Sequence, residues 1–294
     1  MSEGINPFPT TIDEQIGMTS GAKLAKTIGD EIMILEKNGL KYFVFKHITD
    51  IGIPHCISTR VGGVSSGVYS SLNLTYTTGD DKDAVDANYQ KLCDALGFDM
   101  SNMAKTKQVH GTNIAKVDEA GVYGDTDGLM TNKTGIALTT YYADCVPLLF
   151  YDPKKNIAAN AHAGWRGVAE DMAGKVVAAM IKQYGCDPKD VLVGIGPSIS
   201  VKNFVVGQDV ANIFKKQLPF SEEFIYNSRN EQDKLNVDLW QICRSSLLRA
   251  GVIDANIEIA GLCTYDNDQL FFSHRRDGMA RGGMAAFIKI KNEK

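Results

Sequence analysis

Residues 143–167 read Ala143-Asp-Cys-Val-Pro-Leu-Leu-Phe-Tyr-Asp-Pro-Lys-Lys-Asn-Ile-Ala-Ala-Asn-Ala-His-Ala-Gly-Trp-Arg-Gly167. Two apolar runs flank Asp152-Pro-Lys-Lys155, and Asp and Pro are residues that favour turns. Each run has the length of an ordinary strand. The stretch therefore predicts a β-hairpin.

The register of this hairpin brings two reactive side chains together. If Tyr151 and Asn156 are the last paired residues, Cys145 lies directly opposite His162, with Cβ atoms about 4.5–5.5 Å apart. A single metal ion could bridge such a pair. A one-residue slip would place the two side chains on opposite faces, so this pairing depends on the register.

The rest of the chain mixes short strands with helices. Alternating or apolar runs predict strands at 32–36, 41–46, 56–59, 105–109, 113–117, 136–141, 145–151, 157–162, 191–195, 257–260, 270–273 and 284–290. Apolar spacing of three and four predicts helices at 83–96, 168–184, 210–218 and 237–250. Asn38-Gly39 joins the first two strands as a hairpin turn. Because several neighbouring strands read as hairpins, we predict an α+β fold with a mixed sheet, in one domain over 30–294 after a flexible leader at 1–29.

The composition narrows the class of protein. The 294 residues are 44% hydrophobic and 22% charged, with a formal net charge of −4. A nucleic-acid partner usually leaves a basic surface, so none is expected. No apolar run reaches the ~18–20 residues of a membrane span, and no signal peptide is recognisable. Six scattered cysteines favour reduced thiols and a cytoplasmic location; the oligomeric state stays open.

A third metal ligand has few candidates, because the chain has five histidines. His110 follows a predicted strand and precedes a glycine. Catalytic zinc commonly has three protein ligands and one open position, where bound water becomes acidic. The spacing alone leaves a second interpretation open, since a histidine or cysteine in a strand is more often a packed residue.

Two segments offer groups for an anion. The loop from Arg60 to Asn73 is rich in glycine and serine, although an ordinary surface loop is the commoner meaning of such a composition. Arg166 lies in Gly164-Trp-Arg-Gly167 at the start of a predicted helix, where free amides attract anions.

These motifs together resemble one family. The resemblance runs from about residue 32 to 290 and rests on Arg60–Leu74, Gln108–Gly111, Asp127-Gly128, Ala143–Pro147, His162–Gly167, Gly196-Pro197, Cys263–Tyr265 and Phe271–Arg276. The chain resembles the laccase-domain, or multicopper polyphenol oxidase, family of bacterial purine nucleoside phosphorylases.

The resemblance implies a site, an activity and a fold. It implies a metal triad of His110, Cys145 and His162 that holds zinc, with copper claimed for some members. It further implies phosphorolysis of adenosine, inosine, guanosine and methylthioadenosine, together with adenosine deamination. The implied fold is a mixed β-sandwich flanked by helices and related to the cysteine-hydrolase fold of bacterial toxin deamidases.

The chain departs from the family pattern in two places. Ser198 and Ser200 stand where cysteines are common, which argues against a copper site that needs those thiols. Arg281-Gly-Gly283 replaces the usual Thr-Gly-Arg before the last strand, which leaves a phosphate role for Arg281 open.

These expectations combine into one hypothesis of mechanism. A zinc ion on the triad would polarise the reacting group of a purine nucleoside. Arg60 and Arg166 are the candidates for binding phosphate, and Asn73 and Gln108 are the candidates for hydrogen bonds to substrate. Deamination would also need a carboxylate proton shuttle, for which Asp144 is the nearby candidate.

Three alternatives remain at this point. A copper-dependent polyphenol oxidase would need several coppers, and five histidines are few ligands for them. A metal-free cysteine hydrolase that edits peptidoglycan precursors would use Cys145 as nucleophile and His110 or His162 as base. A protein that zinc only stabilises would show no nucleoside turnover.

Overall fold

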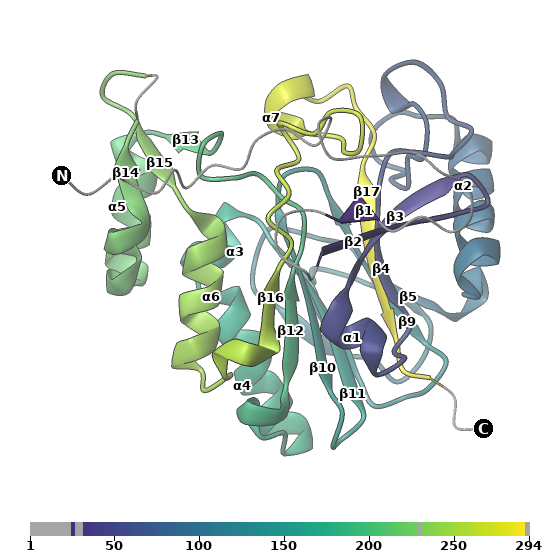
Figure 1. The fold of residues 1–294 in the computed structure, drawn as a ribbon, viewed down its shortest axis with the longest axis horizontal. Helices are drawn as coiled ribbons and strands as arrows, with labels where there is room; N and C mark the ends of the chain where they lie inside the picture. The colour runs from purple at the N-terminus through teal and green to yellow at the C-terminus, as the bar shows by residue number, and fades with distance from the viewer. Residues whose placement is uncertain (1–24, 27–31, 229–230, 292–294) are drawn as a thin grey trace.

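The protein, described here by a computed structural model, stacks helices and two β-sheets in layers (Figure 1). The structure describes residues 25–26, 32–228 and 231–291. Most of the predicted leader at 1–29 therefore lies outside the described residues. Its Ala25–Lys26 pairs with the next strand as β1.

The larger sheet has eight strands in the order β1-β2-β3-β4-β17-β9-β5-β7. These are Ala25–Lys26, Ile32–Lys37, Leu40–Phe45, His55–Ser58, Met284–Lys289, Ala137–Tyr142, Met103–Thr106 and Gly121–Tyr123. The strands from β1 to β9 are antiparallel, whereas β5 runs parallel to both of its neighbours. The β2–β3 hairpin turns at Asn38 and Gly39, as predicted, with φ of 54° and 77°.

The second sheet has six strands in the order β16-β12-β10-β11-β8-β6. These are Ile257–Ile259, Leu192–Ile195, Val146–Asp152, Ile157–Ala163, Gly128–Thr131 and Ile114–Lys116. Its two outermost pairs are parallel and the others are antiparallel, so both sheets are mixed. A small third sheet joins β13 (Val205–Val206), β15 (Leu235–Val237) and β14 (Ile225–Asn227).

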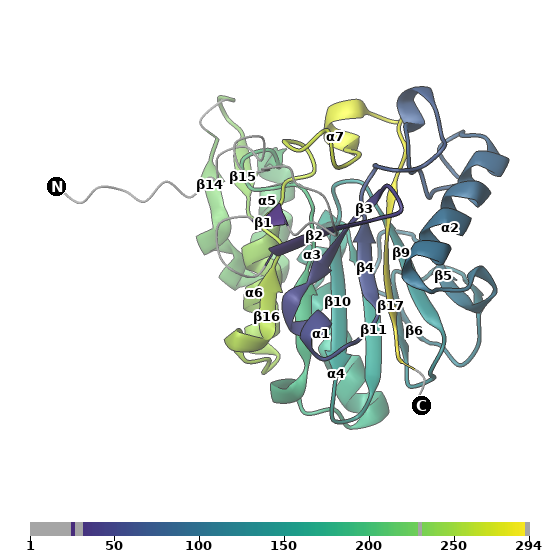
Figure 2. The same ribbon diagram turned by 45° about the vertical axis from the view of Figure 1, so that its right-hand side comes forward.

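Helices cover the outer faces of the two large sheets (Figure 2). The α-helices are α1 (Lys46–Asp50), α2 (Lys82–Leu96), α3 (Trp165–Ala169), α4 (Met172–Tyr184), α5 (Gln208–Gln217), α6 (Leu239–Arg249) and α7 (His274–Asp277). Short 3₁₀ helices occur at Gly67–Tyr69, Met100–Asn102, Pro188–Asp190, Pro219–Phe224 and Asp254–Asn256. Helices α4 and α6 pack on the six-stranded sheet, and α2 packs on the eight-stranded one. Among the described residues, no helix combines the length and the apolar character that crossing a membrane requires.

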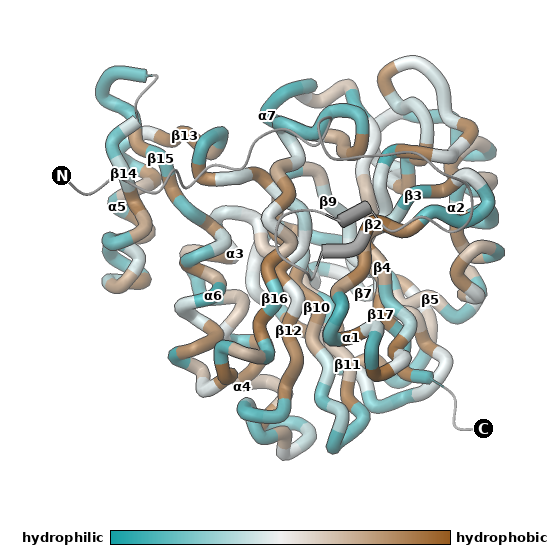
Figure 3. Tube along the Cα trace, in the orientation of Figure 1, coloured by the Kyte–Doolittle hydropathy of each residue, from teal (hydrophilic) through white to brown (hydrophobic). Residues whose placement is uncertain are grey.

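The two sheets face each other across a shared hydrophobic core. Phe45 and Ile57 of the larger sheet pack in one cluster with Leu149 and Tyr151 of the smaller. Hydrophobic segments gather along the central strands, and hydrophilic ones lie mostly on helix surfaces and loops (Figure 3). The predicted α+β fold with mixed sheets is therefore confirmed.

The helix predicted at 168–184 is not continuous. The span 168–184 is divided into α3 and α4, because Asp171 adopts a left-handed φ of 63° between them. The Asp171 side chain accepts a hydrogen bond from the Gly174 amide and caps the new helix. The apolar periodicity continues across the break, which is why the sequence pattern does not show it.

The strand predicted at 270–273 is also wrong. Phe271 and Phe272 are buried as expected of a core strand. The amides of Leu270 and Phe271, however, both donate to the Asn267 carbonyl, so this backbone forms a turn. Burial of an apolar run alone therefore does not distinguish a strand from a packed turn.

Candidate metal centre

The β10–β11 hairpin supplies two of the three potential ligands, in a register that differs from the prediction. The structure pairs Asp152 with Ile157 and Pro147 with His162, so Cys145 is not directly opposite His162. The turn begins at Asp152, whose Oδ1 accepts hydrogen bonds from the amides of Lys154 and Lys155. The difference is two residues, which keeps each side chain on its expected face. Cys145 lies just before β10 and diagonal to His162.

The third potential ligand comes from a loop after β5. His110 has a left-handed φ of 60°. The amides of Val109, His110 and Gly111 all donate to the carboxylate of Asp127, at 3.1, 3.0 and 2.9 Å. Three hydrogen bonds to one buried carboxylate stabilise a backbone conformation that histidine seldom adopts.

Asp127 also positions His162. It directly precedes β8, and the β8–β11 pairing of Gly128 with Ala161 places Asp127 beside His162. The His162 Nδ1 lies 2.8 Å from Asp127 Oδ1, and the His162 amide donates to the Asp127 carbonyl at 2.7 Å. With Nδ1 as the donor, the other ring nitrogen of His162, Nε2, is left as the potential ligand atom.

The structure brings His110, Cys145 and His162 into one cluster. Their potential ligand atoms all lie within 4.8 Å of one another. The centroids of the two imidazole rings are 4.9 Å apart, and the rings are arranged edge to face. A Cβ atom on Gly164 would lie 3.0 Å from His110 Cδ2, 3.4 Å from Cys145 Sγ and 3.5 Å from His162 Cε1. Glycine at 164 therefore keeps open the space between the three side chains.

The electrostatics of the cluster favour a thiolate. Burial alone would raise the pKa of the Cys145 thiol, but the charge of His162 and hydrogen bonds from both histidines lower it to about 6. Burial lowers the pKa of His162, yet Cys145 and Asp127 together raise it to about 9. A thiolate and two imidazoles form a nitrogen and sulfur donor set that suits a zinc ion with one open position. Binding of a metal there would release the proton on Nε2 of His162, while the proton on Nδ1 stays on its hydrogen bond to Asp127.

The predicted substrate amides have protein partners. Asn73 is fully buried, and its amide bonds to Asp80, Thr75 and the Gly283 amide. Gln108 binds the amide and carbonyl of Tyr141 in β9. Both side chains therefore hold loops against the larger sheet, and their contact with substrate stays a prediction.

The two predicted phosphate-binding arginines have protein contacts as well, and their contact with phosphate stays a prediction. Arg60 stacks on Phe272 and donates to the carbonyls of Ser70 and Asp268. It lines a surface depression to which none of the three potential ligands contributes. Arg166 is exposed and stacks on the neighbouring Trp165.

Asp144, the expected proton shuttle, links two parts of the site. Its carboxylate accepts hydrogen bonds from the hydroxyls of Thr264 and Ser273 and from the Arg275 amide, at 2.6, 3.0 and 2.6 Å. It therefore ties the start of β10 to the segment before β17.

Sequence reasoning missed the roles of Asp127 and Gly164. Asp127 lies in one of the motifs singled out above, but no spacing rule pairs it with His162, because Asp127 precedes β8 and His162 lies in β11. Gly164 stands two residues after His162 in the quoted stretch, which was the available signal.

Comparison with known proteins shows the family. The family profile described as "Multi-copper polyphenol oxidoreductase laccase" matches residues 54–291. A purine nucleoside phosphorylase of Bacteroides thetaiotaomicron is 34% identical over 248 residues, which is 81% of this chain and 92% of that protein. Purine nucleoside phosphorylase YfiH of Escherichia coli is 35% identical over 239 residues, which is 81% of this chain and 93% of that protein.

Solved structures agree with this assignment. YlmD of Geobacillus stearothermophilus superposes with a TM-score of 0.81 at 32% identity, covering 87% of this chain and 98% of that one. The hypothetical protein YfiH of Bacillus licheniformis gives the same TM-score and coverage at 30% identity. From its profile match, its relatives and its fold, this chain belongs to the multi-copper polyphenol oxidoreductase laccase family, which includes proteins named purine nucleoside phosphorylase.

Proposed function

We propose that this protein is a zinc-dependent purine nucleoside phosphorylase acting on adenosine, inosine, guanosine or methylthioadenosine. The observation that carries the proposal is the cluster of His110, Cys145 and His162 around Gly164. The names of the relatives support phosphorolysis, and the nitrogen and sulfur donors support zinc.

The described side chains have separate tasks in this proposal. A zinc ion held by the triad would supply Lewis-acid polarisation of the reacting group. Asp127 holds His162 with its proton on Nδ1 and fixes the loop that carries His110. Gly164 leaves the space in which a substrate atom can approach. Phosphorolysis passes through an oxocarbenium-like state, so the positioning of phosphate and nucleoside should account for much of the rate.

The test is an assay of purine release with and without phosphate. Wild type should release base together with ribose 1-phosphate, and only when phosphate is present. Cys145→Ala should lose both zinc and activity, whereas Cys93→Ala, in α2 on the far side of the larger sheet, should keep them. Base release that is indifferent to phosphate and to Cys145→Ala would contradict the proposal.

Adenosine deamination is proposed as a second activity of the same site. A zinc ion held by His110, Cys145 and His162 would supply the activation of water that hydrolytic deamination of a purine ring needs. Asp144 has its carboxylate oxygens engaged by Thr264, Ser273 and Arg275, so we give it a positioning role rather than that of proton shuttle. Inosine formed from adenosine without phosphate would support this activity, and its absence would remove it.

A metal-free cysteine hydrolase is the alternative favoured by a specific observation. The lowered pKa of Cys145 beside His162 is what a nucleophilic thiolate requires. The same pairing is our support for the relation to the cysteine-hydrolase fold. Zinc-free protein that stays active, and that loses its activity on alkylation of Cys145, would favour this alternative. Copper-dependent oxidation of a phenol by metal-defined protein would favour a polyphenol oxidase instead.

We further propose that the protein works in the cytoplasm. All six cysteines are free in the structure, and five of them are buried. Unpaired cysteines are typical of reducing compartments.

A further inference from the structure

The register of the larger sheet places the segment with Arg281 beside the segment with Cys145. Strand β17 pairs with β9, and Met284 opposite Tyr142 is the last pair at this end. Arg281 comes three residues before Met284, and Cys145 comes three residues after Tyr142. The two segments therefore leave the same end of the sheet side by side.

A second set of contacts holds these segments together. The Arg275 amide and the Ser273 hydroxyl both donate to Asp144, the residue before Cys145. The loop between α7 and β17, which carries Arg281, is thus fixed at both ends beside the start of β10.

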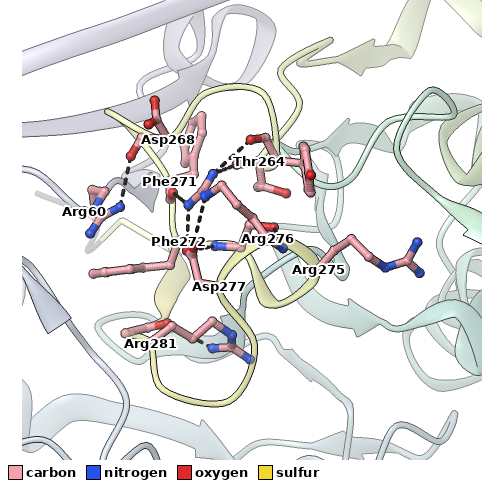
Figure 4. A network of polar contacts seen from close by, with 12 residues as sticks. Arg60, Thr264, Asp268, Phe271, Phe272, Arg275, Arg276, Asp277 and Arg281 are labelled. Atoms are coloured by element: carbon pink, nitrogen blue, oxygen red, sulfur yellow. Dashed lines mark hydrogen bonds and ion pairs between the residues drawn. The ribbon is translucent and has the colours of Figure 1, made fainter. Parts of the chain in front are cut away.

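The other arginines drawn in Figure 4 have their guanidinium groups engaged by the protein. Arg276 pairs with Asp277 and donates to the carbonyls of Thr264, Tyr265 and Phe271. Arg275 donates to the carbonyls of Asn203 and Val205. Arg60 donates to the carbonyls of Ser70 and Asp268.

Arg281 differs from these arginines along one edge of its guanidinium. Its Nη1 donates to the Gly282 carbonyl at 2.9 Å. Its Nε is buried, and no group among the described residues accepts a hydrogen bond from it. Its Nη2 lies 3.5 Å from His274 Nδ1, at the exposed end of the side chain. Leaving a buried donor of a charged group unpaired costs free energy. A hydrogen-bond acceptor from outside the chain would therefore stabilise this edge.

The electrostatics point in the same direction. Burial lowers the pKa of Arg281, whereas the charges of Asp144, Cys145 and Asp277 raise it. Asp144 and Asp277 already accept hydrogen bonds from other donors. An external anion would complete the environment of the guanidinium.

We propose that the Nε and Nη2 edge of Arg281 binds two oxygens of inorganic phosphate beside the metal cluster. Two parallel donors on a planar guanidinium match the spacing of phosphate oxygens. The identity of the anion as the attacking co-substrate rests on the proposed function; the binding of phosphate does not. The site would thus place phosphate next to the cluster.

The test measures phosphate binding to the metal-loaded full chain by calorimetry, without nucleoside. Arg281→Gln should weaken phosphate binding about tenfold or more, and Arg281→Lys should restore part of it. Arg275→Gln, a control in the preceding helix α7, should leave binding unchanged. Melting temperature and metal content of each variant would show that the fold and the cluster are intact.

Several outcomes would overturn the inference. Equal phosphate binding by wild type and Arg281→Gln, or a loss confined to Arg60→Gln or Arg166→Gln, would contradict it. Adenosine 5′-monophosphate that binds through Arg281 while inorganic phosphate does not would make the ligand a phosphate ester and refute the assignment to inorganic phosphate.

The kinetics separate this inference from the proposed function. In an active enzyme, Arg281→Gln should raise the KM for phosphate far more than the KM for nucleoside. Phosphate-dependent base release with an unchanged KM for phosphate in Arg281→Gln would defeat the inference and leave the function standing. Phosphate binding through Arg281 without any base release would defeat the function and leave the anion site standing.

Discussion

Asp127 connects two of the three potential metal ligands. Its carboxylate accepts hydrogen bonds from the His162 ring and from three successive amides of the His110 loop. Hydrogen bonds from His162 and from the amides of Gly111 and Val109 outweigh burial and lower the pKa of Asp127. A charged carboxylate in this position orients the imidazole and makes it a stronger ligand.

Asp127→Asn should therefore weaken metal binding about 10- to 100-fold, since an amide carries no charge and accepts fewer hydrogen bonds. The measurement is competition for zinc with a chelator of known affinity. Asp125→Asn is the matched control, because Asp125 is exposed on the same loop and asparagine tolerates its positive φ. Equal zinc affinity in wild type and Asp127→Asn would show that the carboxylate has only a structural role.

Cys145 should be the most reactive thiol of the metal-free protein. Its pKa is lowered to about 6, whereas burial raises the pKa of Cys56, Cys93, Cys186 and Cys243. The thiolate is the reacting form, so alkylation by iodoacetamide should rise with pH and reach half its maximal rate near pH 6. Peptide mapping by mass spectrometry would locate the label, and added zinc should protect the site. Preferential labelling of another cysteine at pH 7 would contradict this account of the cluster.

The sequence motifs could identify the three potential ligands, but not the residues around them. Cys145 and His162 come from one hairpin, so local spacing indicates their proximity. This holds even though the observed register differs from the predicted one by two residues. Two protein contacts of Asn73 and Gln108 could not be predicted, because their partners, Gly283 and Tyr141, are distant in sequence. Contacts of this kind depend on the packing of whole strands and leave no local pattern.

At the scale of elements, a break at Asp171 separates α3, which begins beside the candidate site, from α4. Helix α3 begins directly after Gly164, and α4 packs on β11, which carries His162. Local periodicity could predict most strands and helices to within a few residues. It could not predict the break at Asp171, because a left-handed residue interrupts the backbone without changing the apolar pattern.

Asp171→Ala should lower the free energy of unfolding by about 1–3 kcal/mol, because it removes the cap of α4 and places a Cβ-bearing residue without a polar side chain at φ 63°. Asp171→Asn keeps an oxygen for the Gly174 amide and tolerates this φ, so it should cost much less. Urea unfolding followed by circular dichroism measures both variants. An alanine variant as stable as wild type would mean that α3 and α4 can merge into one helix.

At the scale of the whole molecule, the close approach of the two sheets determines where the metal cluster lies relative to the loop with Arg281. His162 belongs to the smaller sheet and Cys145 directly precedes its strand β10, whereas the loop with Arg281 enters the larger sheet. Gly194 in β12 allows this approach, because a Cβ there would lie 2.3 Å from the ring of Phe45 in β3. The α+β class follows from the order of elements, but which glycine faces which ring depends on how the sheets stack.

Gly194→Ala should lower the free energy of unfolding by about 1–3 kcal/mol through overpacking between the sheets. The double variant Gly194→Ala with Phe45→Leu should be less destabilised than the sum of the two single changes, because the smaller side chain makes room. Denaturant unfolding of the four proteins forms a complete cycle. Strict additivity would show that these two positions are not in contact across the sandwich.

The central claim is that the His110–Cys145–His162 cluster supports phosphorolysis of a nucleoside. The direct measurement incubates the zinc-loaded protein with inosine and phosphate carrying ¹⁸O at every oxygen, followed by mass spectrometry of the sugar product. We predict ribose 1-phosphate that retains all the heavy oxygens, because a phosphate oxygen forms the new bond to the sugar, and we predict none from Cys145→Ala. Free ribose as the sugar product, or equal labelled ribose 1-phosphate from Cys145→Ala, would contradict the claim.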